Sequence, residues 1–349
     1  MRKDERGQIS RRRRLSLYIL LPSVVFGLTF PVYAPEASDN ASVPARETKQ
    51  KSATVAAREQ TLSTLLVAAG KLRRAHDTKK TIQTLNEAGH LQLNLFLKQE
   101  ALSTFQQSRD LLDQSIDPST KVDTLNGLAL AYLAVNKYKK AQPLLEQARQ
   151  LTEQSDYPAG KAEALLLLSE CQNYTDHAEA LNTAGEALRL WQSIGNNQGV
   201  VRSHVDIGDY YIAQSNLVEA AQAYQSALDL ATEIGDRTRQ AEALVYLGYV
   251  EFRKSAWQEV FSFMTRAEEL IDSDAEPYVM GRISTGIAEA FIETGMPEVG
   301  LQKYEEALEY FSRTQTPRPV VYAQWGIARA QFFLGKYPEA LSILQKTLA

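Results

Sequence analysis

Residues 201–228 read VRSHVDIGDYYIAQSNLVEAAQAYQSAL, two helical stripes separated by a short polar break at Ser215 and Asn216. In the first half, Ile207, Gly208 and Tyr211 are spaced as one face of a helix. In the second half, small and bulky apolar side chains return at helical spacing. These positions are Ala220, Tyr224, Ala227 and Leu228. The stretch therefore predicts two helices joined by a tight turn.

This pattern recurs seven times along the chain, at intervals of 39 or 40 residues. A small residue marks the first helix of each copy, at Gly89, Ala129, Ser169, Gly208, Gly248, Ala288 and Ala328. A second series marks the second helix, at Ala101, Ala141, Ala180, Ala220, Val260, Gly300 and Ala340. A fixed period of this size predicts stacked copies of one two-helix unit, and hence an all-α fold.

The small residues have a packing reason. Helices pack about 8–10 Å apart, and the shorter distance requires small side chains where the helices cross. Bulky residues then fill the space beside each crossing, and they are Phe105, Leu145, Tyr224, Tyr304 and Leu344. A glycine inside a helix costs about 1 kcal/mol relative to alanine, which close packing must offset.

Turn residues separate the predicted helices. Gly195 and Gly235 are placed to end second helices in the left-handed conformation, and Gly295 and Gly335 to form turns inside the last two copies. The sequence places three prolines in linkers between copies, namely Pro118, Pro158 and Pro277. The third copy is one residue shorter and has Ala184 where the other copies have a bulky residue, so its packing should differ.

The chain resembles the tetratricopeptide repeat family. The best match to the family signature is the set Gly208, Tyr211, Ala220, Tyr224 and Ala227. The family's commonest unit is shorter, at about 34 residues, whereas this period resembles that of the 40-residue arrays. The resemblance covers about residues 79–349 and implies a right-handed superhelix of about seven helix-turn-helix repeats. Such a superhelix binds a protein or peptide in its concave groove and has no catalytic activity of its own.

The resemblance also implies which side chains face the groove. In this family the first helices line the concave side, and the groove-facing positions lie three before, one after and four after the small residue. Aromatic side chains beside arginines are typical of binding hot spots. The predicted partner-binding residues are Val245, Tyr249, Phe252, Arg282, Glu289, Tyr322, Trp325, Arg329 and Phe332. The alternative is that several of these rings pack against the neighbouring copy.

The N-terminal segment, positions 1–34, differs from the rest of the chain. Four arginines at positions 11–14 precede an apolar run, and the segment ends at Ala34. This order is typical of an export signal. Cleavage near Ala34 or Ala37 would release the protein to the periplasm or the exterior. Without cleavage, residues 15–34 would form a membrane anchor with the array facing outward.

Two short segments follow the signal. Residues 35–52 are rich in polar and small residues and are predicted to be a flexible linker. Residues 53–78 are predicted to contain a helix that caps the first copy. Residues 1–34 carry a net charge of +5. Because the whole chain has a net charge of −4, the remainder carries −9. An acidic array is a poor ligand for nucleic acid.

The sequence contains little that suggests catalysis. Cys171 is the single cysteine, and the four histidines are scattered, so we predict that Cys171 is a packed helix residue. No phosphate-binding glycine loop and no serine elbow occurs in the sequence. We therefore expect no enzyme activity, no cofactor and no metal site.

The sequence predicts a non-catalytic protein-interaction scaffold, exported or tethered to the membrane, with two alternatives open. Similar 40-residue arrays precede the catalytic domains of bacterial caspase-like (CHAT-type) proteases, so the chain could be the sensing region of a larger enzyme. The sequence also stops within the second helix of its last copy, at Ala349. An uncapped final copy would offer an apolar surface for self-association.

Overall fold

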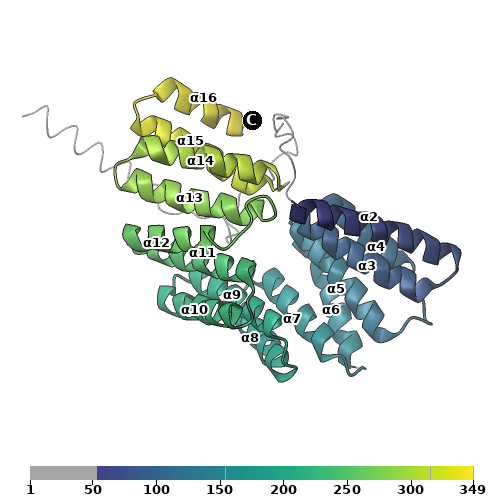
Figure 1. Ribbon diagram of the computed structural model, residues 1–349. Helices are drawn as coiled ribbons and strands as arrows, with labels where there is room; N and C mark the ends of the chain where they lie inside the picture. The colour runs from purple at the N-terminus through teal and green to yellow at the C-terminus, as the bar shows by residue number, and fades with distance from the viewer. Residues whose placement is uncertain (1–52, 154, 315, 349) are drawn as a thin grey trace, which may run out of the picture. The chain divides into compact units, whose positions relative to one another are not determined.

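The computed structural model describes residues 53–153, 155–314 and 316–348, which belong to one compact unit. These residues form helices and no strand (Figure 1). The helices are α2 (Ala53–Arg74), α3 (Thr78–Asn94), α4 (Lys98–Asp110), α5 (Pro118–Ala134), α6 (Tyr138–Glu153), α7 (Pro158–Gln172), α8 (His177–Ser193), α9 (Asn197–Ala213), α10 (Leu217–Glu233), α11 (Arg237–Arg253), α12 (Trp257–Glu268), α13 (Pro277–Glu293), α14 (Pro297–Ser312), α15 (Pro317–Phe333) and α16 (Tyr337–Leu348). The predicted signal and linker, residues 1–34 and 35–52, lie outside the described residues.

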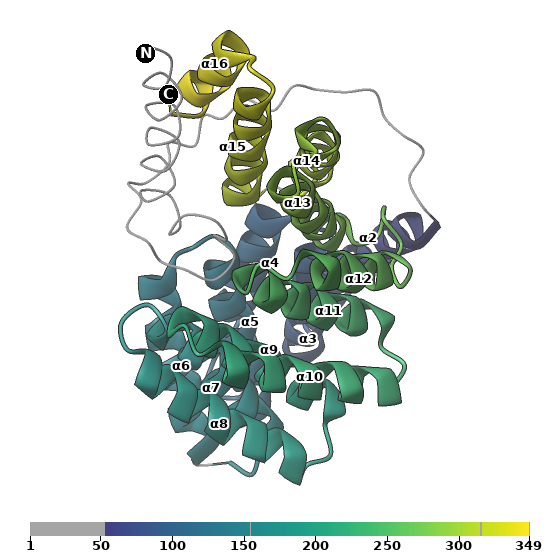
Figure 2. The ribbon, with the colours of Figure 1, turned by 90° about the vertical axis from the view of Figure 1, so that its left-hand side faces the viewer.

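The helices from α3 to α16 form hairpins that stack in chain order. Each odd-numbered helix, called a first helix below, packs against the second helix that follows it and the one that precedes it. Neighbouring first helices also contact one another, as in α3–α5, α5–α7, α11–α13 and α13–α15. The predicted all-α solenoid is confirmed (Figures 1 and 2).

Cap residues and prolines set where the first helices begin. Asp117 precedes α5, and its Oδ1 accepts a hydrogen bond from the backbone N–H of Thr120 at 3.0 Å. The prolines that the sequence assigned to linkers, Pro118, Pro158 and Pro277, are instead the first residues of α5, α7 and α13. Proline suits this position because the first N–H of a helix has no partner within the helix.

Glycines end helices as predicted. Gly195, Gly235, Gly295 and Gly335 have φ angles of +68°, +71°, +86° and +77°. The turns inside the earlier hairpins have the same left-handed conformation without glycine. The residues are Phe96, Asn136, Ser215 and Ser255, with φ between 58° and 63°. The shorter third hairpin has no residue of this kind between α7 and α8.

The series of small residues marks close helix crossings, as predicted. A Cβ added to Gly208 would lie 2.4 Å from the ring of Tyr224, and one added to Gly89 would lie 2.6 Å from Phe105. In both pairs the ring follows the glycine by sixteen residues. The ring therefore occupies the volume that a side chain on the first helix would need.

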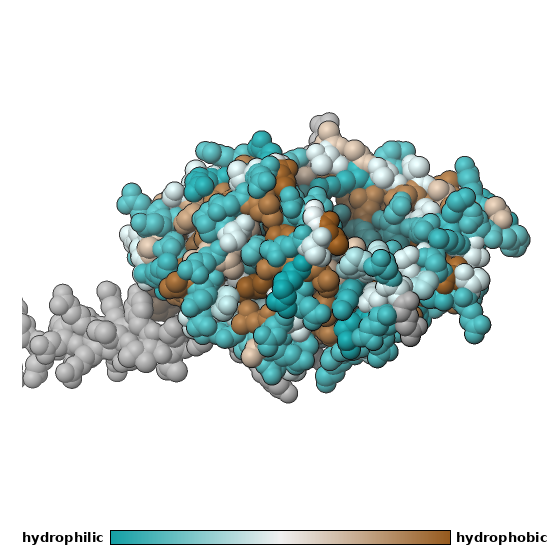
Figure 3. Space-filling model, turned by 90° about the horizontal axis from the view of Figure 1, so that it is seen from below, coloured by the Kyte–Doolittle hydropathy of each residue, from teal (hydrophilic) through white to brown (hydrophobic). Residues whose placement is uncertain are grey.

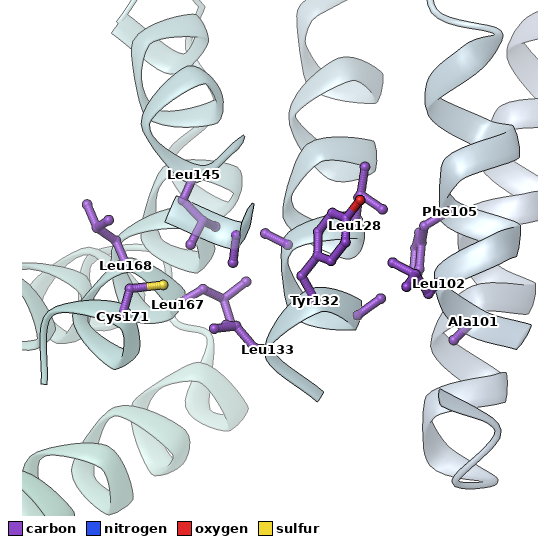
Figure 4. Packing of buried hydrophobic residues seen from close by; sticks show 13 residues of the cluster. Ala101, Leu102, Phe105, Leu128, Tyr132, Leu133, Leu145, Leu167, Leu168 and Cys171 are labelled. Carbon is purple, nitrogen blue, oxygen red and sulfur yellow. The ribbon is translucent and has the colours of Figure 1, made fainter. Parts of the chain in front are cut away.

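Packing between hairpins is continuous from α4 to α7. Phe105, Leu128, Leu145 and Leu168 belong to one buried cluster that also contains Cys171 (Figure 4). The Cys171 side chain is 6% exposed, and burial raises the pKa of its thiol to about 12. The prediction that Cys171 is a packed helix residue is confirmed.

The third hairpin packs differently from its neighbours, as its sequence indicated. Ala184 leaves space where the other copies carry a bulky side chain, and Tyr210 of the next copy packs in the same cluster. The hydroxyl groups of Tyr210 and Ser169 lie 2.8 Å apart in a buried hydrogen bond. A ring from the following hairpin thus compensates for the small residue.

Among the described residues, no helix combines the length and apolar character that a membrane span requires. The predicted anchor at residues 15–34 is outside that part of the chain. Within residues 53–78, α2 packs against α3; its role as a cap stays a prediction.

Candidate binding surface on the first helices

The first helices form the inner side of the array. Consecutive first helices contact one another at α3–α5, α5–α7, α7–α9, α11–α13 and α13–α15, whereas the second helices of the described residues make their extensive contacts with first helices. Elements that lie closer together belong to the inside of a curve. A row of side chains along these helices is therefore the candidate binding surface.

Burial corrects the rule that selected groove residues. Val245 lies three residues before the small residue and is 1% exposed. Its equivalents in the preceding copies, Leu166 and Val205, are also buried. Ile212 and Ile292, four residues after the small residue, are buried too. These five residues pack inside the array, whereas Phe252, at the second of the two positions in α11, is partly exposed.

Trp325 and Phe332 occupy the same two positions in α15 but remain partly or largely exposed. Phe332 is 50% exposed, and its neighbour Phe333 is 45% exposed. The reason is that no first helix follows α15 within the described part of the chain. With Tyr337 and Leu341 of α16, these rings make the C-terminal hairpin the richest in exposed apolar side chains.

Glu289 of α13 is fully buried and joins three helices. Its carboxylate accepts hydrogen bonds from the hydroxyl of Tyr304 on α14 and from that of Tyr322 on α15, the latter at 2.8 Å. Arg329 on α15 completes the group by pairing with Glu289 and Glu293. Predicted residues Glu289, Tyr322 and Arg329 are thus brought together, but as a packed polar network.

Arg282 of α13 is 4% exposed and stacks over the ring of Tyr246, with 4.1 Å between guanidinium carbon and ring centroid. Its Nε has no hydrogen-bond partner. A cation over an aromatic face is stabilised even when it is removed from water. Tyr249 is 7% exposed and Phe252 partly exposed. Contact between any of the predicted residues and a ligand stays a prediction.

A row of charged residues was missed by the sequence rule. Arg202 on α9 forms two hydrogen bonds with Glu163 on α7, at 2.8 and 3.0 Å. Arg239 pairs with Glu242 on α11 at 2.6 Å. Glu163, Arg202 and Glu242 all lie six residues before the small residue. The position six before the small residue and the position one after it are seven residues apart, which is two helical turns. Both therefore lie on the same face of the helix, and extending the predicted face by two turns would have found the row.

Two carboxyl groups in the middle of this row have no ion-pair or hydrogen-bond partner among the described residues: Glu170 of α7 and Asp206 of α9. Burial raises the pKa of each to about 7, and the negative charge of Asp206 adds to the effect on Glu170. Arg202 and Arg239 oppose the shift at Asp206 without cancelling it. This part of the row is short of positive charge.

The unpaired state of Glu170 follows from the sequence of its hairpin. Asp209, its equivalent in the next copy, accepts a hydrogen bond from the Tyr224 hydroxyl at 2.5 Å. Glu289 has the same arrangement with Tyr304. In the third copy the tyrosine position is occupied by Ala184, so Glu170 has no such donor.

Metal-ligating side chains do not gather in the described residues, where no three His, Cys, Asp or Glu side chains could share an ion. His90 packs edge-to-face against Phe105, and burial lowers the pKa of its imidazole. Most of the molecular face in Figure 3 is hydrophilic, with smaller hydrophobic patches between the hydrophilic side chains.

Comparison with known proteins agrees with this architecture. Residues 175–233 match the family model described as tetratricopeptide repeat. A search of the curated proteins found no match to the chain.

Three solved structures are similar. Aspartyl phosphate phosphatase F from Bacillus subtilis has 10% identity and a TM-score of 0.60, over 79% of this chain and 72% of that one. The Rap conjugation gene regulator of plasmid pLS20, in complex with the Phr* peptide, has 14% identity and a TM-score of 0.54, over 82% and 84%. A signal transduction ATPase with numerous domains and a tetratricopeptide repeat sensor, from Pyrococcus horikoshii, has 15% identity and a TM-score of 0.54, over 83% and 47%.

The chain thus spans about half the length of the Pyrococcus horikoshii protein. At these identities the similarity shows the fold alone. The repeat period, the stacked hairpins and the family model that matches residues 175–233 agree, and the described residues fold as an all-α solenoid similar to tetratricopeptide repeat arrays.

Proposed function

We propose that this array is a scaffold that binds an extended segment of a partner protein, or a peptide, along the row of side chains on its first helices. The observation that carries the proposal is that Glu170 and Asp206, in the middle of that row, have no ion-pair or hydrogen-bond partner among the described residues. The Rap regulator, which has the same fold, was solved with a peptide bound.

The chemistry of the row predicts a kind of ligand. A lysine or arginine side chain placed between Glu170 and Asp206 would favour the ionised form of both carboxyl groups and form charge-assisted hydrogen bonds with them. The partly exposed ring of Trp325 and the exposed ring of Phe332 would contact apolar side chains of the same segment. The proposed ligand is therefore a polypeptide segment with a basic residue and an apolar portion.

A selection of short random peptides on the purified full chain tests this proposal, with affinities measured by fluorescence polarisation. We expect the selected peptides to share a basic residue. Changing Glu170→Gln and Asp206→Asn together should weaken binding by about tenfold or more, a loss of at least about 1.4 kcal/mol. Trp325→Ala and Phe332→Ala should weaken it as well.

Glu219→Gln is the matched control, because Glu219 is exposed on the second helix α10. This variant should bind as the original chain does. Equal affinity of the Glu170/Asp206 double variant and the original chain for every selected peptide would exclude the inner row as the site.

We further propose that the protein works outside the cytoplasm, either released or tethered through residues 15–34. The support is the order of the N-terminal segment, in which a cationic stretch precedes an apolar one. An alkaline phosphatase fusion after residue 52 should be active in a bacterial host, and removal of residues 1–34 should abolish that activity. Full activity without residues 1–34 would contradict export.

A second candidate is a sensing array within a larger enzyme. The observation that favours it is the similarity to a signal transduction ATPase that carries a tetratricopeptide repeat sensor, about half of which the chain spans. Sequencing the transcript beyond the codon for Ala349 tests it. A reading frame that continues into a domain with its own catalytic residues would support this candidate over the stand-alone scaffold.

A further inference from the structure

Two polar contacts join the N-terminal helices to hairpins near the other end of the array. Arg58 on α2 forms an ion pair with Glu276, with Nη2 and Oε1 3.0 Å apart, and its Nη1 donates to the carbonyl of Ala275 at 3.2 Å. Lys98, the first residue of α4, donates from Nζ to the hydroxyl of Thr316. In Figure 1 the start of α2 lies beside the loop that precedes α13.

The two contacts are copies of each other. Arg58 and Glu276 are 218 residues apart, and so are Lys98 and Thr316. Lys98 follows Arg58 by 40 residues, and Thr316 follows Glu276 by the same 40. The repeat geometry thus brings equivalent positions together after about five and a half hairpins. Such recurrence is expected when a superhelix completes one turn.

The acceptors are the residues that should cap two first helices. Glu276 and Thr316 are the N-cap residues of α13 and α15, but neither side chain makes a capping hydrogen bond. Other first helices are capped by their own aspartate, such as Asp236 before α11. At α13 and α15 the side chain instead accepts from a cation one superhelical turn away.

Polar side chains, rather than a packed core, make this connection. The extensive helix contacts in the described residues join helices that are neighbours or next neighbours in the chain. The Arg58 and Glu276 side chains are 30% and 20% exposed. Partly exposed ion pairs of this kind weaken as salt concentration rises. The connection is therefore suited to opening and closing.

We propose that Arg58–Glu276 and Lys98–Thr316 form a latch that closes one superhelical turn of the array, and that release of the latch widens access to the inner face. The control of access rests on the proposed function, whereas the latch itself does not. Closure would restrict entry to a thin, extended segment, and a bulkier partner would require the latch to open.

Distance measurement between spin labels on the full chain tests the latch without any ligand. Labels at Gln60→Cys and Glu298→Cys, in a Cys171→Ala background, sit on exposed positions of α2 and α14. We expect one short-distance population. The charge reversals Arg58→Glu and Glu276→Arg should each at least double the fraction of longer distances, and the two together should restore the short one.

Arg149→Glu is the control, because Arg149 pairs with Glu146 and Glu153 within α6. It should leave the distances unchanged. If circular dichroism shows that a reversal variant does not fold, two other experiments take its place. These are the Arg58→Gln variant and a salt titration of the chain with the original Arg58–Glu276 pair, and both should lengthen the distances between the labels. Unchanged distances in folded single variants, or no recovery in the double reversal, would overturn the latch. Failure of peptide binding alone would not.

Discussion

Single residues in the turns inside the hairpins decide how much strain the array carries. Ser255 and Gly295 occupy the same turn position in consecutive hairpins, with φ of 60° and 86°. The left-handed region costs a residue with a Cβ roughly 1–2 kcal/mol of conformational energy, whereas glycine has no such cost. The same backbone path is therefore strained in one hairpin and relaxed in the next.

We expect Ser255→Gly to stabilise the protein by about 1 kcal/mol and Gly295→Ser to destabilise it by a similar amount. Urea unfolding followed by circular dichroism measures both. Ser226→Gly is the control, since Ser226 is exposed inside α10. There glycine should cost about 0.5–1 kcal/mol. A loss of stability in Ser255→Gly would show that the turn is not strained.

Glycines at the helix crossings are required for a different reason, namely the lack of space for a side chain. A Cβ on Gly208 would lie 2.4 Å from the Tyr224 ring, which is fully buried and cannot move aside. Gly208→Ala should therefore destabilise the array by about 1–3 kcal/mol. Gly185 lies inside α8 with only the end of the Arg189 side chain nearby, at 3.7 Å. Gly185→Ala should stabilise by about 0.5–1 kcal/mol, and thermal unfolding of both variants checks the opposite signs.

At the scale of helices, the sequence predicted the hairpins because close crossings need small residues at a fixed phase. It predicted the inner surface less well. Which strip of a first helix faces inward depends on the neighbouring hairpin, and an apolar residue such as Val245 fits either environment. The position of Ser215 in a left-handed turn was also missed, because only glycine signals that conformation clearly.

The latch and the unpaired carboxyl groups could not be read from a single copy. Arg58 meets Glu276 only after the curvature of several hairpins has accumulated. Glu170 lacks a donor because Ala184 replaces a tyrosine in its own hairpin. The shortened copy was visible in the sequence, so its unusual packing was predictable, while its consequence for Glu170 required knowing which side chains meet.

The carboxyl groups of the row make stability depend on pH. Burial raises the pKa of Asp206 from its ordinary value of 3.8 to about 7. Between these pH values the native state holds a proton on Asp206 that the unfolded chain has released. The contribution of protonated Asp206 to the free energy of unfolding is therefore full below about pH 4 and is lost as the pH rises through 7. Asp206→Asn should remove this loss.

The free energy of unfolding of Asp206→Asn, relative to the original chain, should therefore rise by about 1–3 kcal/mol between pH 5 and pH 8. Urea titrations at both pH values measure it. Glu219→Gln should show no such change. A constant difference between Asp206→Asn and the original chain across this range would mean that Asp206 is ionised throughout.

At the scale of the whole molecule, stacked hairpins make stability a local property. Each hairpin packs mainly against its neighbours, so the array behaves as a row of coupled units. Burial is uneven along this row. Residues 281–290 of α13 are all buried, whereas α16 buries only Ala340 among the residues whose exposure is described. We expect amide hydrogens in α13 to exchange slowest and those in α16 fastest.

A substitution near one end should accordingly leave the other end unchanged. Gly326 lies in α15, and a Cβ there would lie 2.2 Å from the Tyr304 ring of α14. Gly326→Ala should speed hydrogen exchange in α14, α15 and α16 by about tenfold, the change expected for a loss of about 1.4 kcal/mol, while α5 to α8 keep their rates. Mass spectrometry of peptic fragments resolves the two regions. Equal acceleration in every helix would show that the hairpins unfold as one cooperative body, because only then does a clash in α15 reach α5.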